Sequence, residues 1–315
     1  MTRRALAILA FLALLLAACV PGAATPTAVP GVSGPATVAP PRAFPATITD
    51  FQNRSVGVPA EPQRIVSIGP SNTEFLFALD AGSRVVGVDD FSDEPAAAAK
   101  IDKVGGVKVN VEKVVSLRPD LVISVKFSDG TIERISSAGI PVLVVDPQTL
   151  GDVARTAILI GHAVGKDGDG LARSIDQKLQ AVKAKVASAT TTPRVFHEVD
   201  ASDPAKPFTV GPGSYINDLI ALVRGANIAA GAGSAYPQMS LEEIVRADPE
   251  VIVLGDADYG TTFEQVSTRP GWSGMSAVKS KRVYPIADSL VSRPGPRVAD
   301  AAEAYARLVH PELFR

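Results

Sequence analysis

The chain has 315 residues, of which 46% are hydrophobic, and its 31 basic and 33 acidic residues give a formal net charge of −2. This length and apolar content allow one large or two medium domains and exclude a chain that is disordered throughout. The nearly neutral balance, without a basic stripe, argues against nucleic-acid binding. The three histidines lie far apart and the only cysteine is Cys19, so we expect no resident metal site and no intrachain disulfide.

Residues 1–18 are predicted to be a signal peptide. Two arginines precede an apolar run from Ala5 to Ala18, whose fourteen residues are too few for a membrane-spanning helix. The run ends in Leu-Ala-Ala before Cys19, which resembles the lipobox of bacterial lipoproteins. That resemblance implies an acylated Cys19 and an extracytoplasmic, membrane-anchored protein, in the periplasm or on the outer face of the cell membrane.

Residues 19–58 are predicted to be the lipidated cysteine and a tether. Seven prolines lie among Ala, Thr, Gly and Ser between Val20 and Thr47. Such a composition cannot assemble a core and favours extended polyproline conformations. The folded part is therefore expected to work close to a membrane.

After Pro62, short β-branched runs alternate with helical patterns, which is typical of an α/β fold with a mainly parallel sheet. The predicted strands cover residues 64–68, 85–88, 121–125, 142–145, 194–198, 251–254 and 283–286, with helices over 73–79 and 214–223. Arg64 and Arg194 open the two halves, and the pattern of residues 112–120 recurs at 242–250 with the same offset. We therefore expect one unit written twice, as an N-terminal lobe over 59–165 and a C-terminal lobe over 191–315.

One long helix is predicted to link the lobes, within residues 166–190. Apolar residues recur at helical spacing from Leu171 to Val186, with charged residues between them. Ligands of parallel sheets bind beyond the carboxyl ends of the strands, so two facing lobes are expected to share one ligand cleft.

The folded part resembles the helix-linked periplasmic binding proteins of ABC importers, which capture vitamin B12, ferric siderophores or haem. The segments that carry the resemblance are 64–74, 87–95, 112–123, 139–142 and 293–297. The resemblance implies a monomeric capture protein and not an enzyme, whose partners are a permease dimer with its ATPase. It favours cobalamin or a ferric siderophore as the ligand, with haem as an alternative and no intrinsic cofactor.

The resemblance also implies one permease-docking glutamate per lobe, at Glu112 and Glu242. Each follows an expected helix N-cap, Asn110 or Ser240, by two positions. Glu243 fits a capping box with Ser240, which is a structural role. A first-turn acid also favours the helix dipole, so a structural role stays open for the two docking candidates as well.

Ligand contacts are expected in the loops after the strands. The candidates are Ser71, Asn72, Phe91, Phe127, Tyr215, Tyr236, Tyr259, Asp288 and Arg293. Phe91, Tyr236 and Arg293 are the leading ones, because the resemblance implies aromatic residues at the first two places and a basic residue at the third. Phe91 is equally compatible with a role in packing the core.

Other residues bear on the ligand. Gly105 and Gly106 stand where the family's B12 binders tend to carry a tryptophan, which weakens the case for cobalamin. A basic cleft would suit an anionic siderophore, and haem would need an axial Tyr or His, for which Tyr215, Tyr236 and Tyr259 are available. We expect Trp272 and His197 to be core residues and Arg297 to anchor a turn.

A lipid-anchored hydrolase or a surface sensor module would share the signal peptide and the tether. The segments 211–215 and 271–275 both break the G-x-S-x-G spacing of a nucleophile elbow, so the sequence offers little for a hydrolase. A neighbouring permease and ATPase would distinguish an importer component from a sensor.

Overall fold

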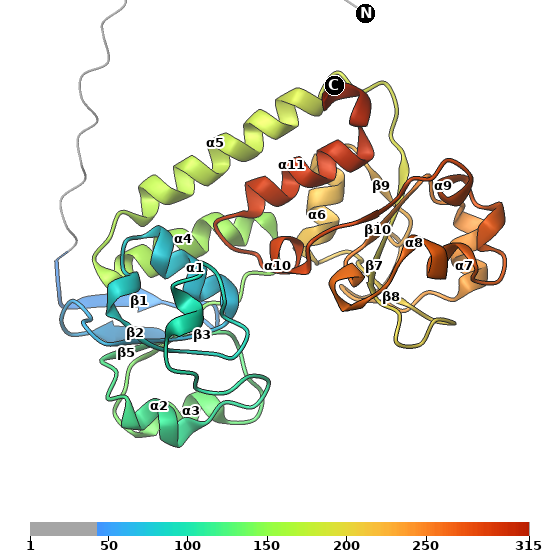
Figure 1. Cartoon of the computed structure of the whole chain (residues 1–315). Coiled ribbons are helices and arrows are strands. Elements are labelled where there is room, and N and C mark those ends of the chain that lie inside the picture. Colours follow the sequence, from blue (N-terminus) through green and yellow to red (C-terminus); the bar gives the residue numbers. More distant parts are fainter. Residues whose placement is uncertain (1–42, 315) are drawn as a thin grey trace, which may run out of the picture. The chain divides into compact units, whose positions relative to one another are not determined.

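The computed structural model describes residues 43–314 (Figure 1). The predicted signal peptide, Cys19 and most of the predicted tether lie outside these residues. Within residues 43–314, no helix combines the length and the apolar content that crossing a membrane requires. Short 3-10 helices connect several elements, namely η1 (Gly82–Arg84), η2 (Ala98–Lys100), η3 (Ala257–Tyr259), η4 (Trp272–Gly274) and η5 (Pro311–Phe314).

The first lobe contains a four-stranded parallel sheet in the order β4-β3-β5-β6. Its strands are β3 (Ile65–Ile68), β4 (Val85–Val88), β5 (Leu121–Ser124) and β6 (Val142–Val144). Its helices are α1 (Pro70–Ala78), α2 (Val111–Ser116), α3 (Thr131–Ser137) and α4 (Leu150–Val164). Successive side chains of a strand point to opposite faces, so Leu121 and Ile123 join the core shared with α1 and α4, whereas Val122 packs with α2 and α3.

The second lobe repeats this arrangement, with β9, β7, β10 and β11 parallel and β8 added antiparallel to the end of β7. The strands are β7 (Arg194–Asp200), β8 (Phe208–Thr209), β9 (Ala226–Asn227), β10 (Val251–Leu254) and β11 (Val283–Pro285). The helices are α6 (Tyr215–Leu222), α7 (Leu241–Ala247), α8 (Phe263–Ser267), α9 (Ser276–Lys279), α10 (Asp288–Val291) and α11 (Val298–Val309). The core side chains of α6 and α11 cover one face of the sheet, and those of α7, α8 and α9 cover the other. The predicted α/β fold with two lobes is confirmed.

The repeat between the two halves holds in the hydrogen bonds as well as in the strands. Arg64 Nε donates to the carbonyl oxygen of Leu117 at 3.1 Å, and Arg194 Nε donates to that of Ala247 at 3.0 Å. Both arginines tie the start of the central strand β3 or β7 to the end of α2 or α7, the helix that precedes the neighbouring strand β5 or β10. β3 and β5 also pair in the same register as β7 and β10. The internal repeat is therefore a repeat of structure.

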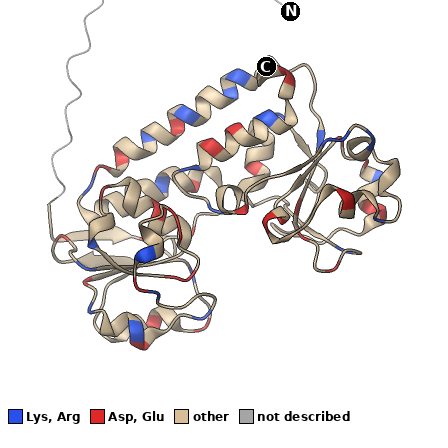
Figure 2. Cartoon of the chain, viewed as in Figure 1, with Lys and Arg blue, Asp and Glu red and all other residues tan. Residues whose placement is uncertain are grey.

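The predicted linking helix is α5 (Gly168–Val186). At about 1.5 Å per residue it is ~28 Å long, and it packs on both α4 and α11 (Figure 1). A Cβ atom on Gly168 would lie 2.2 Å from the carbonyl oxygen of Ala157, so only glycine permits this close approach of α5 to α4. Acidic and basic residues lie along the exposed side of α5 (Figure 2), while Ile175, Leu179 and Val186 are buried. The helix thus belongs to a core that both lobes share.

The predicted tether is wrong over residues 46–58, which are folded. β1 (Ala46–Thr49) and β2 (Ser55–Val58) form an antiparallel hairpin whose Ile48 and Val58 are buried in the main core. The buried carboxylate of Asp50 accepts hydrogen bonds from the side chain of Arg54 at 2.9 and 2.7 Å. Each strand has four residues and two buried side chains at most. The alternation of apolar and polar residues was therefore too short to indicate a strand next to the proline-rich segment.

Candidate functional site

The loop from β3 into α1 is built around buried polar contacts. A Cβ atom on Gly69, whose φ is 117°, would lie 2.7 Å from Val125 Cγ1, so the turn requires glycine. Asn72 Nδ2 donates to the carbonyl oxygens of Ile68 at 3.3 Å and Val145 at 3.2 Å. Asn72 is fully buried and Ser71 nearly so. Asn72 thus holds the strand ends together, and neither candidate presents its side chain at the surface.

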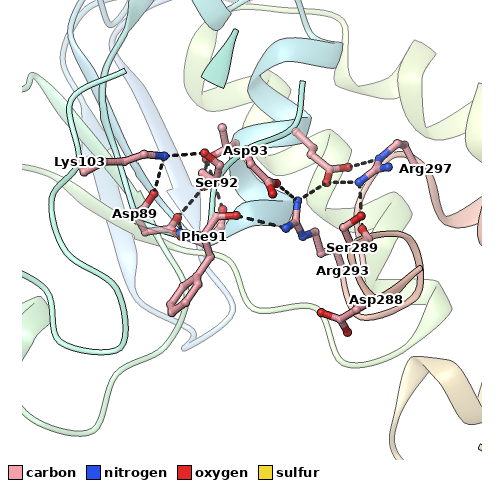
Figure 3. Close-up of polar contacts among 12 residues, drawn as sticks. Asp89, Phe91, Ser92, Asp93, Lys103, Asp288, Ser289, Arg293 and Arg297 are labelled. Carbon is pink, nitrogen blue, oxygen red and sulfur yellow. Dashed lines mark hydrogen bonds and ion pairs between the residues drawn. The ribbon is translucent and has the colours of Figure 1, made fainter. Parts of the chain in front are cut away.

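Phe91, by contrast, is 52% exposed, so it does not fill the core. Its loop is held by the buried carboxylate of Asp89, which accepts hydrogen bonds from the amides of Gly69 at 2.7 Å and Phe91 at 2.9 Å and from the Ser92 hydroxyl at 2.7 Å (Figure 3). Lys103 Nζ donates to the carbonyl oxygens of Asp89 and Ser92. The loop is thus fixed while the ring remains available.

The Phe91 ring lies over Gly106. A Cβ atom on Gly106 would lie 3.1 Å from ring atoms Cε2 and Cζ of Phe91 and 3.2 Å from a carboxylate oxygen of Asp90. Because residue 106 has no side chain, the Phe91 ring has room to lie against it. In the sequence, the same glycine weakened the case for cobalamin. Val107, at the tip of the same loop, is 86% exposed.

The substitution Gly106→Ala should displace the Phe91 ring and weaken ligand binding about fivefold, which corresponds to roughly 1 kcal/mol. The free energy of unfolding should change little, because the ring is exposed. Gly57→Ala is the matched control, since a Cβ atom there has nothing within 4 Å. Titration calorimetry on both variants measures the effect, and equal affinities would contradict the contact.

The second lobe adds further exposed aromatic rings after its strands. Tyr236 is 44% exposed and Tyr259 is 78% exposed, whereas Tyr215 is buried. Phe208, which is not among the residues predicted from the sequence, is 39% exposed and lies on β8 opposite Asp200 at the end of β7. A strand as short as β8 cannot show an alternating pattern, so no sequence signal marked Phe208. We call Phe91, Phe208, Tyr236 and Tyr259 the aromatic surface.

A hollow of about 440 Å³ lies at the ends of β7 and β10. Its lining residues are Val199, Asp200, Ala201, Ser202, Asp256, Tyr259 and Thr261. The hydroxyl of Thr261 donates to the carboxylate of Asp256 at 2.8 Å, and the hydroxyl of Tyr259 donates to that of Asp288 at 3.0 Å. The lining contains two acidic residues and no basic residue.

The basic candidates near these loops are already paired (Figure 3). Arg293 Nη1 lies 2.6 Å from Asp93 Oδ1 and 3.5 Å from Glu74 Oε1. Arg297 donates to both carboxylate oxygens of Glu74, at 2.9 and 2.7 Å, and to the carbonyl oxygen of Ser289. Arg297 therefore joins α1 to the start of α11, a longer-range role than the expected anchoring of a turn.

The charges of the site shift several pKa values. The hydrogen bond from Arg293 lowers the pKa of Asp93 below its usual value. Burial raises the pKa of Asp146, which is half buried after β6, although the charge of Lys126 opposes the shift. Burial also raises the pKa of Tyr236, and the charge of Asp146 raises it further. Tyr236 of the second lobe thus lies within electrostatic reach of an acid of the first lobe.

Other residues considered from the sequence belong to the core. His197 is buried on β7, its Nδ1 lies 2.6 Å from the Tyr305 hydroxyl, and burial lowers its pKa to about 3. Trp272 is buried edge-on against Phe196 with ring centroids 5.9 Å apart. Both expectations are confirmed. Phe127 is half buried against the core around α2 and α3. Among residues 43–314, no group of His, Cys, Asp and Glu side chains is arranged to hold a metal ion.

The docking candidates begin α2 and α7. Asn110 and Ser240 cap these helices as predicted, and Glu243 closes the capping box with Ser240. Glu112 and Glu242 are exposed, and within the described part of the chain neither side chain has a hydrogen-bond or ion-pair partner. α2 and α7 pack on the sheet faces opposite to the core that contains α5, at the lower left and the right of Figure 1.

Comparison with known proteins decides the family. Residues 65–290 match the family model described as periplasmic binding protein. The chain belongs to this family. The binding protein is 39% identical over 281 residues to the ABC transporter substrate-binding lipoprotein YvrC of Bacillus subtilis (strain 168), and the match covers 86% of this chain and 88% of that protein.

Two further relatives carry names that mention a ligand. A cobalamin-binding protein of Halobacterium salinarum (strain ATCC 29341 / DSM 671 / R1) is 30% identical to this binding protein over 283 residues, which is 85% of this chain and 74% of that one. The structure of the periplasmic haem-binding protein RhuT of Roseiflexus sp. RS-1, in apo form, matches with a TM-score of 0.71 and 25% identity, over 79% of this chain and 99% of that one.

Membership of this family makes the chain the substrate-binding component of an ABC transporter and not an enzyme. The hydrolase considered from the sequence is thereby set aside. The relatives named for cobalamin and haem share the fold, so the ligand must be argued from the residues of this site.

Proposed function

We propose that this binding protein captures cobalamin and delivers it to an ABC permease. The observation that carries the proposal is the combination of exposed aromatic rings on both lobes with arginines that are already paired. Large flat ligands bind to aromatic surfaces with a few polar anchors. The corrin ring of cobalamin is such a ligand, and its edge carries neutral primary amides rather than carboxylates.

The charges support cobalamin over haem or an anionic siderophore. Arg293 is only 14% exposed and faces the carboxylates of Glu74 and Asp93. The acids of the hollow, Asp200 and Asp256, have no basic residue beside them in the lining. The carboxylates of haem or of an anionic siderophore would meet like charges here, whereas amide N–H groups would find hydrogen-bond acceptors.

The proposal includes the anchoring and docking inferred from the sequence. Acylation of Cys19 would hold the folded body near the membrane, as the word lipoprotein in the name of the B. subtilis relative supports. We assign Glu112 and Glu242, one on each lobe, to the contact with the permease. Neither side chain has an intramolecular partner among the described residues. We further propose that the chain acts as a monomer, with a first lobe that includes the β1–β2 hairpin and ends near residue 165, a second lobe over 191–315 and the linker within 166–190.

The full chain, purified in detergent, should be stabilised by hydroxocobalamin. At a concentration of 100 times Kd, a ligand adds ~2.7 kcal/mol of stability, which corresponds to a rise in Tm of roughly 5–10 °C. Thermal shifts with hydroxocobalamin, a ferric trihydroxamate siderophore and haem provide the comparison. A shift with haem or the siderophore but none with hydroxocobalamin would reject the assignment.

A further inference from the structure

One guanidinium group bridges two segments that lie far apart in the chain. Arg293 belongs to the segment between α10 and α11, and it reaches the loop after β4 in the first lobe (Figure 3). Its Nη1 donates to Asp93 Oδ1 at 2.6 Å and its Nη2 donates to the carbonyl oxygen of Phe91 at 3.2 Å. The second contact reaches the main chain of the residue whose ring is the first lobe's part of the aromatic surface.

The main chain of Phe91 is thus held on both sides. Its N–H donates to Asp89 of the same lobe, and its carbonyl oxygen accepts from Arg293. The ring itself is half exposed and contacts Gly106, which has no side chain to enclose it. The direction of the ring therefore depends on the position of this main chain as well as on the contact with Gly106, and the hydrogen bond from Arg293 is one of the two that hold the main chain.

The surroundings of Arg293 make it a poor anchor for an anionic ligand group. Asp93 and Glu74 place carboxylate oxygens 2.6 Å and 3.5 Å from Nη1, and because Glu74 also pairs with Arg297, the two arginine charges face two carboxylate charges. The planar fork of arginine can donate to a carboxylate and a carbonyl oxygen at the same time, which the ammonium group of lysine does less well. Both terminal nitrogens of the Arg293 side chain are therefore engaged in these hydrogen bonds, and its charge is compensated by the nearby carboxylates.

We propose that Arg293 is a positioning residue, which orients the Phe91 ring for the ligand and ties it to the α10–α11 segment. The inference rests on the proposed ligand site, in which the Phe91 ring contacts cobalamin. It assigns to Arg293 no direct contact with the ligand.

The substitution Arg293→Lys keeps the charge and removes the fork, so it separates the two roles. We expect the affinity of the full chain for hydroxocobalamin to fall about tenfold, as it should in Phe91→Ala. The double variant should bind no more weakly than Phe91→Ala alone, because Arg293 acts through that ring. Arg307→Lys, in an exposed pair with Glu303 on α11, is the matched control and should bind normally. Unchanged affinity in Arg293→Lys, or equal losses with and without the Phe91 ring, would overturn the proposal.

A second measurement needs no ligand. Phe91→Trp adds an indole at the surface, while the chain's own Trp272 is fully buried and shielded from quenchers. Adding Arg293→Lys should increase acrylamide quenching and lower the fluorescence anisotropy of the new indole. Asp93→Asn, whose side chain is 60% exposed, should act in the same direction without disturbing Glu74. No change in either variant would refute the positioning role even if cobalamin binds. Failure of hydroxocobalamin to bind the native chain would instead reject the proposed ligand, and the indole signals would still decide the role of Arg293.

Discussion

The double substitution Glu112→Lys and Glu242→Lys, which reverses both docking charges, should abolish uptake. The affinity for the ligand should stay unchanged. Both residues lie in the first turn of an exposed helix, α2 or α7, and the described structure offers their carboxylates no partner. The interaction with the helix dipole is worth only about 0.3–1 kcal/mol at each site. The fold should therefore tolerate the change, and the missing contact with the permease should account for the loss.

The structure provides a closely matched control for this experiment. Glu133 and Glu264 are the first-turn acids of the neighbouring helices α3 and α8, so their reversal changes net charge and helix dipoles by the same amount. Uptake of labelled cobalamin by cells, together with the ATPase activity of the reconstituted transporter, should be lost in the first double variant only. Equal uptake by the two double variants would exclude docking through Glu112 and Glu242.

Neutralising Glu74 should cause a large loss of stability. The side chain is 5% exposed and pairs with Arg297 and Arg293 at once. Removing one partner of a buried ion pair leaves uncompensated charge and costs about 3–5 kcal/mol. The hydrogen bond with Glu74 also raises the pKa of Arg297 above its usual value, which is the sign expected for a stabilising pair. Glu74→Gln keeps the shape of the side chain and removes its charge.

Urea unfolding measures the expected decrease in the free energy of unfolding. Thermal unfolding should show the same loss as a Tm that is lower by roughly 10 °C. Glu303→Gln breaks the exposed pair with Arg307, whose side chains are 46% and 53% exposed, and should cost less than about 0.5 kcal/mol. A loss in Glu74→Gln as small as that in Glu303→Gln would show that the contact between α1 and the segment from α10 to α11 contributes little to folding.

Most of the fold could be predicted because its signals are local. Buried parallel strands such as β10 are apolar throughout, and the apolar stripe of α5 follows the helical period along the whole helix. Polar caps at Asn110 and Ser240 and the prolines that follow their helices mark the ends of each element. The constant offset between the halves repeated the strand and cap signals, so the two lobes followed without any knowledge of contacts.

The candidate site was only partly predictable. Strand-end placement selected Phe91 and Tyr236, whose rings are exposed, but could not tell them from Asn72 and Tyr215, which are buried. Whether a side chain at a strand end points outward depends on what packs beside it. Phe208 escaped because its strand is too short to show a pattern.

The sequence by itself determined the α/β class, the doubled unit, the linking helix and the caps that begin α2 and α7, since all of these depend on residues near one another in the chain. Only the tertiary structure decided how Glu74, Arg293 and Arg297 are paired and which aromatic rings remain exposed. Those contacts join side chains from opposite ends of the folded chain, as between Asp93 and Arg293. No local periodicity or spacing encodes such a pairing; it is settled when α11 and α5 pack the two halves around one core.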